Sequence, residues 1–151
     1  MNKNIDEFEM YRTACEFSES VDLCLNTQNN SLCMTPIIIN AAFSCELFLK
    51  LLLHIKCIRY KKTHDLKILF ELLPEDLKNK VKYCCVKRYG QWLDYCNLEY
   101  LKNISNVFSD WRYNYEHDWS KSAVMKVELG FLIAFKDALK VQFKDIFEVK
   151  R

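Results

Sequence analysis

The chain has 151 residues, of which 50% are hydrophobic and 14% aromatic, and its formal net charge is +2. So apolar a composition excludes an intrinsically disordered chain, and the length suits a single domain, residues 1–151, with a sizeable core. The nearly balanced charge neither requires nor excludes a nucleic-acid partner, because a basic patch can exist on a neutral molecule.

The numbers of turn-forming residues and cysteines indicate the fold class and the redox environment. Only two glycines and two prolines occur, which favours long helices over a turn-rich β architecture. The first nine residues are polar and acidic, so we expect no secretory signal. The eight cysteines contain no Cys-x-x-Cys pair and no zinc-type spacing, so we expect reduced, mostly buried thiols in a cytoplasmic protein that holds no metal or cofactor.

Two helices are predicted in the first third of the chain. Residues 5–25 place apolar side chains at helical spacing, and a polar loop follows at 26–31. Thr35 as N-cap and Pro36 as first helical residue predict a second helix that ends near Ile58. Polar residues interrupt its apolar run, so we interpret it as a buried core helix and expect no membrane span.

Two shorter helices should follow a basic connector. Thr63 is expected to cap a third helix over residues 65–73. Pro74, with acidic residues directly after it, starts a fourth helix that should stop before Gly90. A loop is expected over residues 89–96.

The last third of the chain predicts two more helices. Apolar residues recur with a 3.6-residue period over 98–115, and Ser120 or Ser122 can cap a final helix to about Phe147. No strand-like alternation or internal repeat occurs. The sequence therefore predicts an all-α, up-and-down helical bundle of about five to six helices.

Four motifs occur in one order along residues 37–147: Ala41-Ala42-x-x-x-Glu46-x-x-x-Lys50, Thr63-His64-Asp65-Leu66-x-x-Leu69-Phe70, Leu73-Pro74 and Trp111-Arg112-Tyr113-x-Tyr115-Glu116. Together they resemble the HEPN family, small helical-bundle proteins of prokaryotic toxin–antitoxin and anti-phage defence systems. The resemblance implies a bundle that dimerises and, in many members, a metal-independent RNase. In those members an Arg is followed by a His roughly four to six residues later.

Arg112 and His117 match that Arg–His pattern. The guanidinium would bind the scissile phosphate, and the imidazole would move a proton to or from the ribose. On one continuous helix the two side chains would point about 140° apart, so the helix must end between them or two subunits must contribute. The alternative is an ordinary ion pair between Arg112 and Glu116, four residues on.

Glu46, Asn114 and Glu116 are the candidate supporting residues of the Arg112–His117 site. Glu46 recurs with Lys50 and His54 on one helical stripe, and it either orients Arg112 or pairs with Lys50 on the wet side; we favour the pair. Asn114 is a supporting hydrogen-bond donor or a surface residue. His64 is assigned to the helix start rather than to catalysis.

Basic residues suggest where RNA would bind. Arg59, Lys61 and Lys62 are the candidate phosphate-contacting residues. A stripe of Lys136, Lys140 and Lys144 is interpreted as a solvated face that can add to them.

Two functions from different classes remain. The first is a metal-independent endoribonuclease, the toxin or effector of a defence or toxin–antitoxin system, with RNA as substrate and a cognate antitoxin as partner. The second is a catalytically inactive HEPN dimer that binds RNA or another protein. The aromatic cluster of Trp111, Tyr113, Tyr115 and Trp119 predicts a homodimer in either case. A purely structural bundle would be favoured if Arg112 only paired with Glu116.

Overall fold

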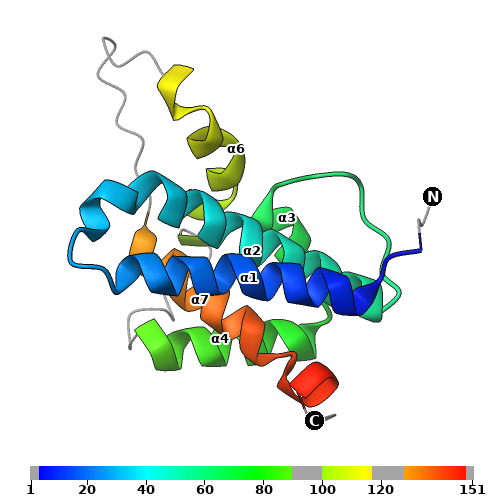
Figure 1. Cartoon of the computed structure of the whole chain (residues 1–151). Helices are drawn as coiled ribbons and strands as arrows, with labels where there is room; N and C mark the ends of the chain where they lie inside the picture. The colour runs from blue at the N-terminus through cyan, green and yellow to red at the C-terminus, as the bar shows by residue number, and fades with distance from the viewer. Residues whose placement is uncertain (1–3, 90–99, 117–127, 149–151) are drawn as a thin grey trace.

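The structure, a computed structural model, describes residues 4–89, 100–116 and 128–148, and within these ranges it contains helices and no strand (Figure 1). The prediction of an all-α bundle is therefore confirmed. The α-helices are α1 (Glu7–Leu25), α2 (Met34–Ile55), α3 (Leu66–Glu71), α4 (Glu75–Tyr89), α6 (Val107–Arg112) and α7 (Leu129–Val141). Shorter turns are η1 (Asn30–Cys33), η2 (Asn114–Glu116) and the π-helical η4 (Lys144–Glu148).

Helices α1 and α2 form an antiparallel hairpin (Figure 1). The Asp6 side chain caps α1 by accepting the Glu9 amide at 3.0 Å. The buried residues of α1, Tyr11, Ala14, Ser18 and Val21, recur every three to four positions, which is the spacing of one helical face. That face packs on α2.

Helix α2 is the core of the bundle and contacts α1, α3, α6 and α7. The stretch Asn30–Ile55 is long and apolar enough to cross a membrane by length and composition alone, but half of its most apolar window is buried within the fold. This agrees with the expected core helix, because a helix that is apolar all round must be covered by its neighbours.

Both ends of α2 differ from the prediction. The helix begins at Met34, so Thr35 is not its cap, and Pro36 lies in the first turn, where its missing N–H needs no partner. It ends at Ile55 rather than Ile58. Cys57 adopts a left-handed φ of 56°, and the Ile58 amide donates to the Leu53 carbonyl at 2.8 Å. This closing turn sets the direction of the basic connector.

The cap of α3 is also different from the prediction. Asp65, not Thr63, is the N-cap, and its carboxylate accepts the Ile68 amide at 3.0 Å. Thr63 lies two residues before this cap and supports it, since its hydroxyl oxygen accepts the Asp65 amide at 3.0 Å. Helix α4 starts and stops as expected, with Leu77, Val81 and Cys85 on its buried face.

The long helix expected over residues 98–115 is interrupted. Residues 100–104 are helical, a turn follows at Ser105 and Asn106, and α6 then begins. The Ser105 carbonyl accepts the Leu66 amide at 3.0 Å, and the Ser105 hydroxyl donates to the Leu101 carbonyl at 2.9 Å. A contact to another helix thus competes with the helical ladder, which the periodicity alone cannot reveal. Residues 98 and 99 lie outside the described residues.

The final helix is shorter than predicted. Helix α7 ends at Val141, and η4 occupies residues 144–148 in place of a continuous helix to Phe147. The N-cap position of α7 is Glu128, so neither Ser120 nor Ser122, which both lie outside the described ranges, caps this helix.

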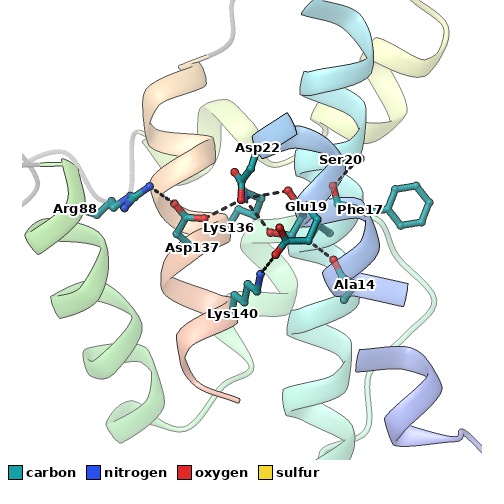
Figure 2. Close-up of polar contacts among 11 residues, drawn as sticks. Ala14, Phe17, Glu19, Ser20, Asp22, Arg88, Lys136, Asp137 and Lys140 are labelled. Carbon is teal, nitrogen blue, oxygen red and sulfur yellow. Dashed lines mark hydrogen bonds and ion pairs between the residues drawn. The ribbon is translucent and has the colours of Figure 1, made fainter. Parts of the chain in front are cut away.

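The prediction of a solvated stripe of Lys136, Lys140 and Lys144 is wrong at Lys136, since Lys144 is exposed in η4 whereas Lys136 is buried on α7. Lys136 is fully buried, and its Nζ atom lies 2.9 Å from Ser18 Oγ and 3.0 Å from carboxylate oxygens of Asp22 and Asp137 (Figure 2). Arg88 pairs with Asp137 at 2.9 Å. The network joins α1, α4 and α7, because a buried ammonium needs such partners.

The cysteines are less buried than expected. All seven within the described residues are free thiols, of which Cys45 and Cys85 are buried and Cys57 is exposed, while four are half-buried. The expectation of reduced thiols agrees with this arrangement, but the expectation that most are buried is wrong. Cys96 lies outside the described residues.

Candidate active site

The candidate site starts from a buried carboxylate on α2. The Glu46 side chain is only 3% exposed. Its Oε1 atom accepts the Lys50 ammonium at 2.6 Å, four residues along the same helix. The predicted Glu46–Lys50 pair is therefore present, but it lies inside the fold and not on a wet face. Burial makes such pairing necessary, since an unpaired carboxylate in the core is very costly.

His64 supplies the second partner of this carboxylate. Its Nδ1 atom lies 3.0 Å from Oε1 and 2.9 Å from Oε2 of Glu46. The loop that carries His64 is fixed on both sides, by the closing turn of α2 and by the Asp65 cap of α3. The connector between α2 and α3 thus holds the imidazole against the centre of the bundle.

Phe108 on α6 connects His64 to Arg112. The His64 and Phe108 ring centroids are 5.5 Å apart, and Phe108 stacks on Phe43 of α2 at 5.0 Å. The Arg112 guanidinium carbon lies 5.0 Å from the Phe108 ring centroid and 4.6 Å from that of Tyr113. Aromatic contacts of this kind hold a guanidinium in place and leave its edge donors free.

The tautomer of His64 follows from the charges around it. A ring nitrogen that faces a carboxylate donates its N–H to it, so Nδ1 of His64 carries a hydrogen, and in the neutral form of the ring the lone pair lies on Nε2. The His64 side chain is 42% exposed. A histidine oriented by a carboxylate in this way can accept a proton through Nε2.

Arg112 lies where the sequence placed it, in the last turn of a helix that ends before position 117. In the part of the chain that the structure describes, it forms no ion pair with Glu116, which lies exposed in η2. The helix ends at Arg112, so the i,i+4 register that such a pair requires is lost. Asn114 belongs to η2. His117 lies outside the described residues.

The sequence interpretation missed the place of His64. Glu46 contacts this histidine and Lys50 rather than Arg112. The local signal is a histidine flanked by two cap-forming residues, Thr63 and Asp65, and this pattern alone indicates only a helix start. His54, the third member of the polar stripe, lies 3.4 Å from Glu7 of α1 and takes no part in the site.

The connector between α2 and α3 carries a group of basic residues. Arg59, Lys61 and Lys62 are exposed, and among the described residues they have no acidic partner. Lys140 pairs with Glu19, and Lys136 is buried, so the α7 stripe does not offer three free cations to a phosphate.

The chain was compared with protein-family models, curated proteins and solved structures. No family model, no curated protein and no solved structure matches the chain.

Proposed function

We propose that this protein is a HEPN-like, metal-independent endoribonuclease. The observation that carries the proposal is the Arg112 guanidinium, which is fixed over two aromatic rings, has no carboxylate partner among the described residues, and shares Phe108 with a carboxylate-oriented histidine. A guanidinium with free donors is well suited to bind a phosphate. The HEPN resemblance of the motifs supports the same chemistry.

The reaction follows from these groups. A histidine accepts the proton of a ribose 2′-hydroxyl, the 2′-oxygen attacks the adjacent phosphorus, and the bond from phosphorus to the 5′-oxygen breaks. The leaving 5′-oxygen takes up a proton, which gives a 2′,3′-cyclic phosphate and a 5′-hydroxyl. Arg112 stabilises the negative charge that develops on the phosphate oxygens. The proton carrier is His117, which the sequence pattern predicts, or His64, which Glu46 orients.

The proposed function also involves RNA-binding residues, a dimer interface and a role in the cell. Arg59, Lys61 and Lys62 would contact the RNA backbone beside the site, since unpaired exposed cations supply most of the affinity for phosphates. Tyr113 and Tyr115 are 45% and 73% exposed, which supports a homodimer interface next to Arg112. By its resemblance the protein would act in the cytoplasm as the toxin or effector of a prokaryotic defence or toxin–antitoxin system, under control of a cognate antitoxin.

The test is cleavage of labelled single-stranded RNA in the presence of a chelator. Arg112→Ala should lower the rate on the order of a hundredfold or more, the usual scale for loss of a charge-stabilising donor. Arg12→Ala is the matched control, because Arg12 is an exposed arginine whose ion pairs among the described residues are with Glu9 and Glu16 on α1. Circular dichroism should verify that each variant is folded.

Two further variants assign the proton carrier. A comparable loss in His117→Ala, with His64→Ala near wild type, assigns the role to His117, and the reverse result assigns it to His64. Equal cleavage by wild type, Arg112→Ala and both histidine variants would indicate a contaminating nuclease. The proposal would then give way to the inactive RNA-binding or protein-interaction module.

A further inference from the structure

A concave site lies between α4 and α7, which pack side by side (Figure 1), and its lining includes neither Arg112 nor His64. It is a cavity of about 210 Å³. Its inner wall consists of apolar side chains from α3, α4, residues 100–104 and α7: Phe70, Val81, Cys85, Leu101, Phe131 and Phe135.

The inner wall is well formed. Each of these six side chains is no more than 5% exposed. Phe135 meets Phe131 in a stacked pair at 5.8 Å and Phe70 edge-on at 5.6 Å, so aromatic contacts fix the three rings. Burial raises the pKa of the Cys85 thiol to about 12, so this group stays neutral. The wall therefore offers no charge to a ligand.

The size of the cavity limits its occupant. Protein interiors are close-packed and contain few voids larger than a water molecule. A dry apolar cavity of roughly 150 Å³ is enough to bind benzene. The present cavity therefore suits one aromatic ring with a short substituent, or a short alkyl chain.

The mouth of the cavity carries charge. Glu71, Lys78 and Lys82 line it. Glu71 pairs with Lys67 at 3.4 Å, and Lys78 pairs with Glu75. Lys82 forms no ion pair within the described part of the chain, although its charge contributes to lowering the pKa of Glu75, after the larger effect of Lys78. One lysine is thus left over at the mouth.

We propose that this cavity binds a small amphipathic carboxylate, with its ring or chain against Phe70, Phe131 and Phe135 and its carboxylate at Lys82. Such an anion places its apolar group in the depth of the cavity and its charge at the one lining lysine that forms no ion pair among the described residues. This site is separate from the proposed RNA site, so the two proposals stand or fall independently.

The test uses phenylacetate and its neutral analogue 2-phenylethanol, titrated by calorimetry into the full chain. Wild type should bind both, and phenylacetate should raise the melting temperature. Lys82→Gln should weaken phenylacetate about fivefold, the scale of one partly exposed ion pair, and leave 2-phenylethanol unchanged. Lys80→Gln is the matched control, since Lys80 is exposed on the same helix but does not line the cavity, and it should bind both as wild type does.

Cavity-filling variants locate the ligand. Val81→Trp should abolish binding of both compounds. If the tryptophan prevents folding, Cys85→Met is the substitute variant, and its smaller side chain should weaken the binding of both compounds. Absence of phenylacetate binding to wild type would overturn the proposal. So would equal losses in Lys82→Gln and Lys80→Gln, or undiminished binding in a folded filling variant.

Discussion

The Nδ1 atom of His64 lies 2.9 Å from Oε2 of Glu46, although the two residues are 18 positions apart in the chain. This contact fixes the loop before α3 to the core of α2. It also leaves the Nε2 atom of the imidazole for chemistry.

Replacement of Glu46 tests this contact through stability. Glu46→Gln keeps the shape of the side chain but removes the charge that satisfies both Lys50 and His64. We expect a loss of about 1–3 kcal/mol in the free energy of unfolding, the cost of leaving partly buried polar groups without a good partner. Urea denaturation measures it. Glu16→Gln is the control and should change nothing measurable, because Glu16 is exposed on α1. A wild-type value for Glu46→Gln would mean that the contact adds nothing to the fold.

The Lys136 network makes a second stability prediction. Lys136→Met leaves Asp22 and Asp137 without their shared ammonium and should lower the free energy of unfolding by about 3 kcal/mol. Combining it with Asp137→Asn should cost less than the sum of the two single changes, because the uncompensated charge is removed. Denaturant titration of the four proteins gives the coupling energy. Lys144→Met is the control, because Lys144 is exposed in η4 and forms no ion pair among the described residues. Strict additivity would contradict the network described here.

These two networks show where sequence reasoning reached its limit. The helical period and the scarcity of glycine predicted the bundle, since amphipathic spacing is a local property of the chain. The same period made Lys136 look solvent-facing, because charge patterns on one helix do not reveal which neighbour covers it.

The site was predicted in part for the same reason. Arg112 in a last helical turn and the Glu46–Lys50 pair are local features, and the sequence indicated both. The contact of His64 with Glu46 and the break at Ser105 depend on tertiary contacts between distant segments. A single sequence carries no direct signal for such contacts.

Buried thiols predict how stability depends on pH. Burial raises the pKa of Cys85 from 9.0 to about 12, and burial raises that of Cys45 in the same direction. The folded-state pKa of each buried thiol lies above its unfolded-state value. Its contribution to the free energy of unfolding is therefore fully present below pH 9 and is lost as the pH rises toward 12. Each group contributes a slope of at most about 1.4 kcal/mol per pH unit.

The measurement is the free energy of unfolding at several pH values from 8 upward. Cys85→Ala should be less stable at neutral pH but show a shallower alkaline decline than wild type. Cys57→Ala removes an exposed thiol and should keep the wild-type slope. An identical slope in Cys85→Ala would show that the buried thiol does not govern this range.

Exposed tyrosines beside Arg112 predict assembly. Tyr113 and Tyr115 meet edge-on at 6.3 Å next to the end of α6, and large exposed aromatic side chains are enriched in interface centres. We expect a dimer in light scattering at micromolar concentration and a monomer for Tyr115→Glu. Tyr83→Glu should stay dimeric, because Tyr83 is equally exposed but lies on α4. A monomeric wild-type protein, or identical behaviour of the two variants, would refute an interface at this position.

Attack by the ribose 2′-oxygen is tested by cleavage of two matched oligonucleotides in the presence of chelator. One is all-RNA, and the other has a single 2′-deoxy residue at the mapped cleavage position. If Arg112 and a histidine promote attack by the ribose 2′-oxygen, wild type should cut the RNA to a 2′,3′-cyclic phosphate and leave the 2′-deoxy position intact. Arg112→Ala should cut neither oligonucleotide at a comparable rate. Cleavage at the 2′-deoxy position, or equal cleavage of the RNA by wild type and Arg112→Ala, would contradict the account.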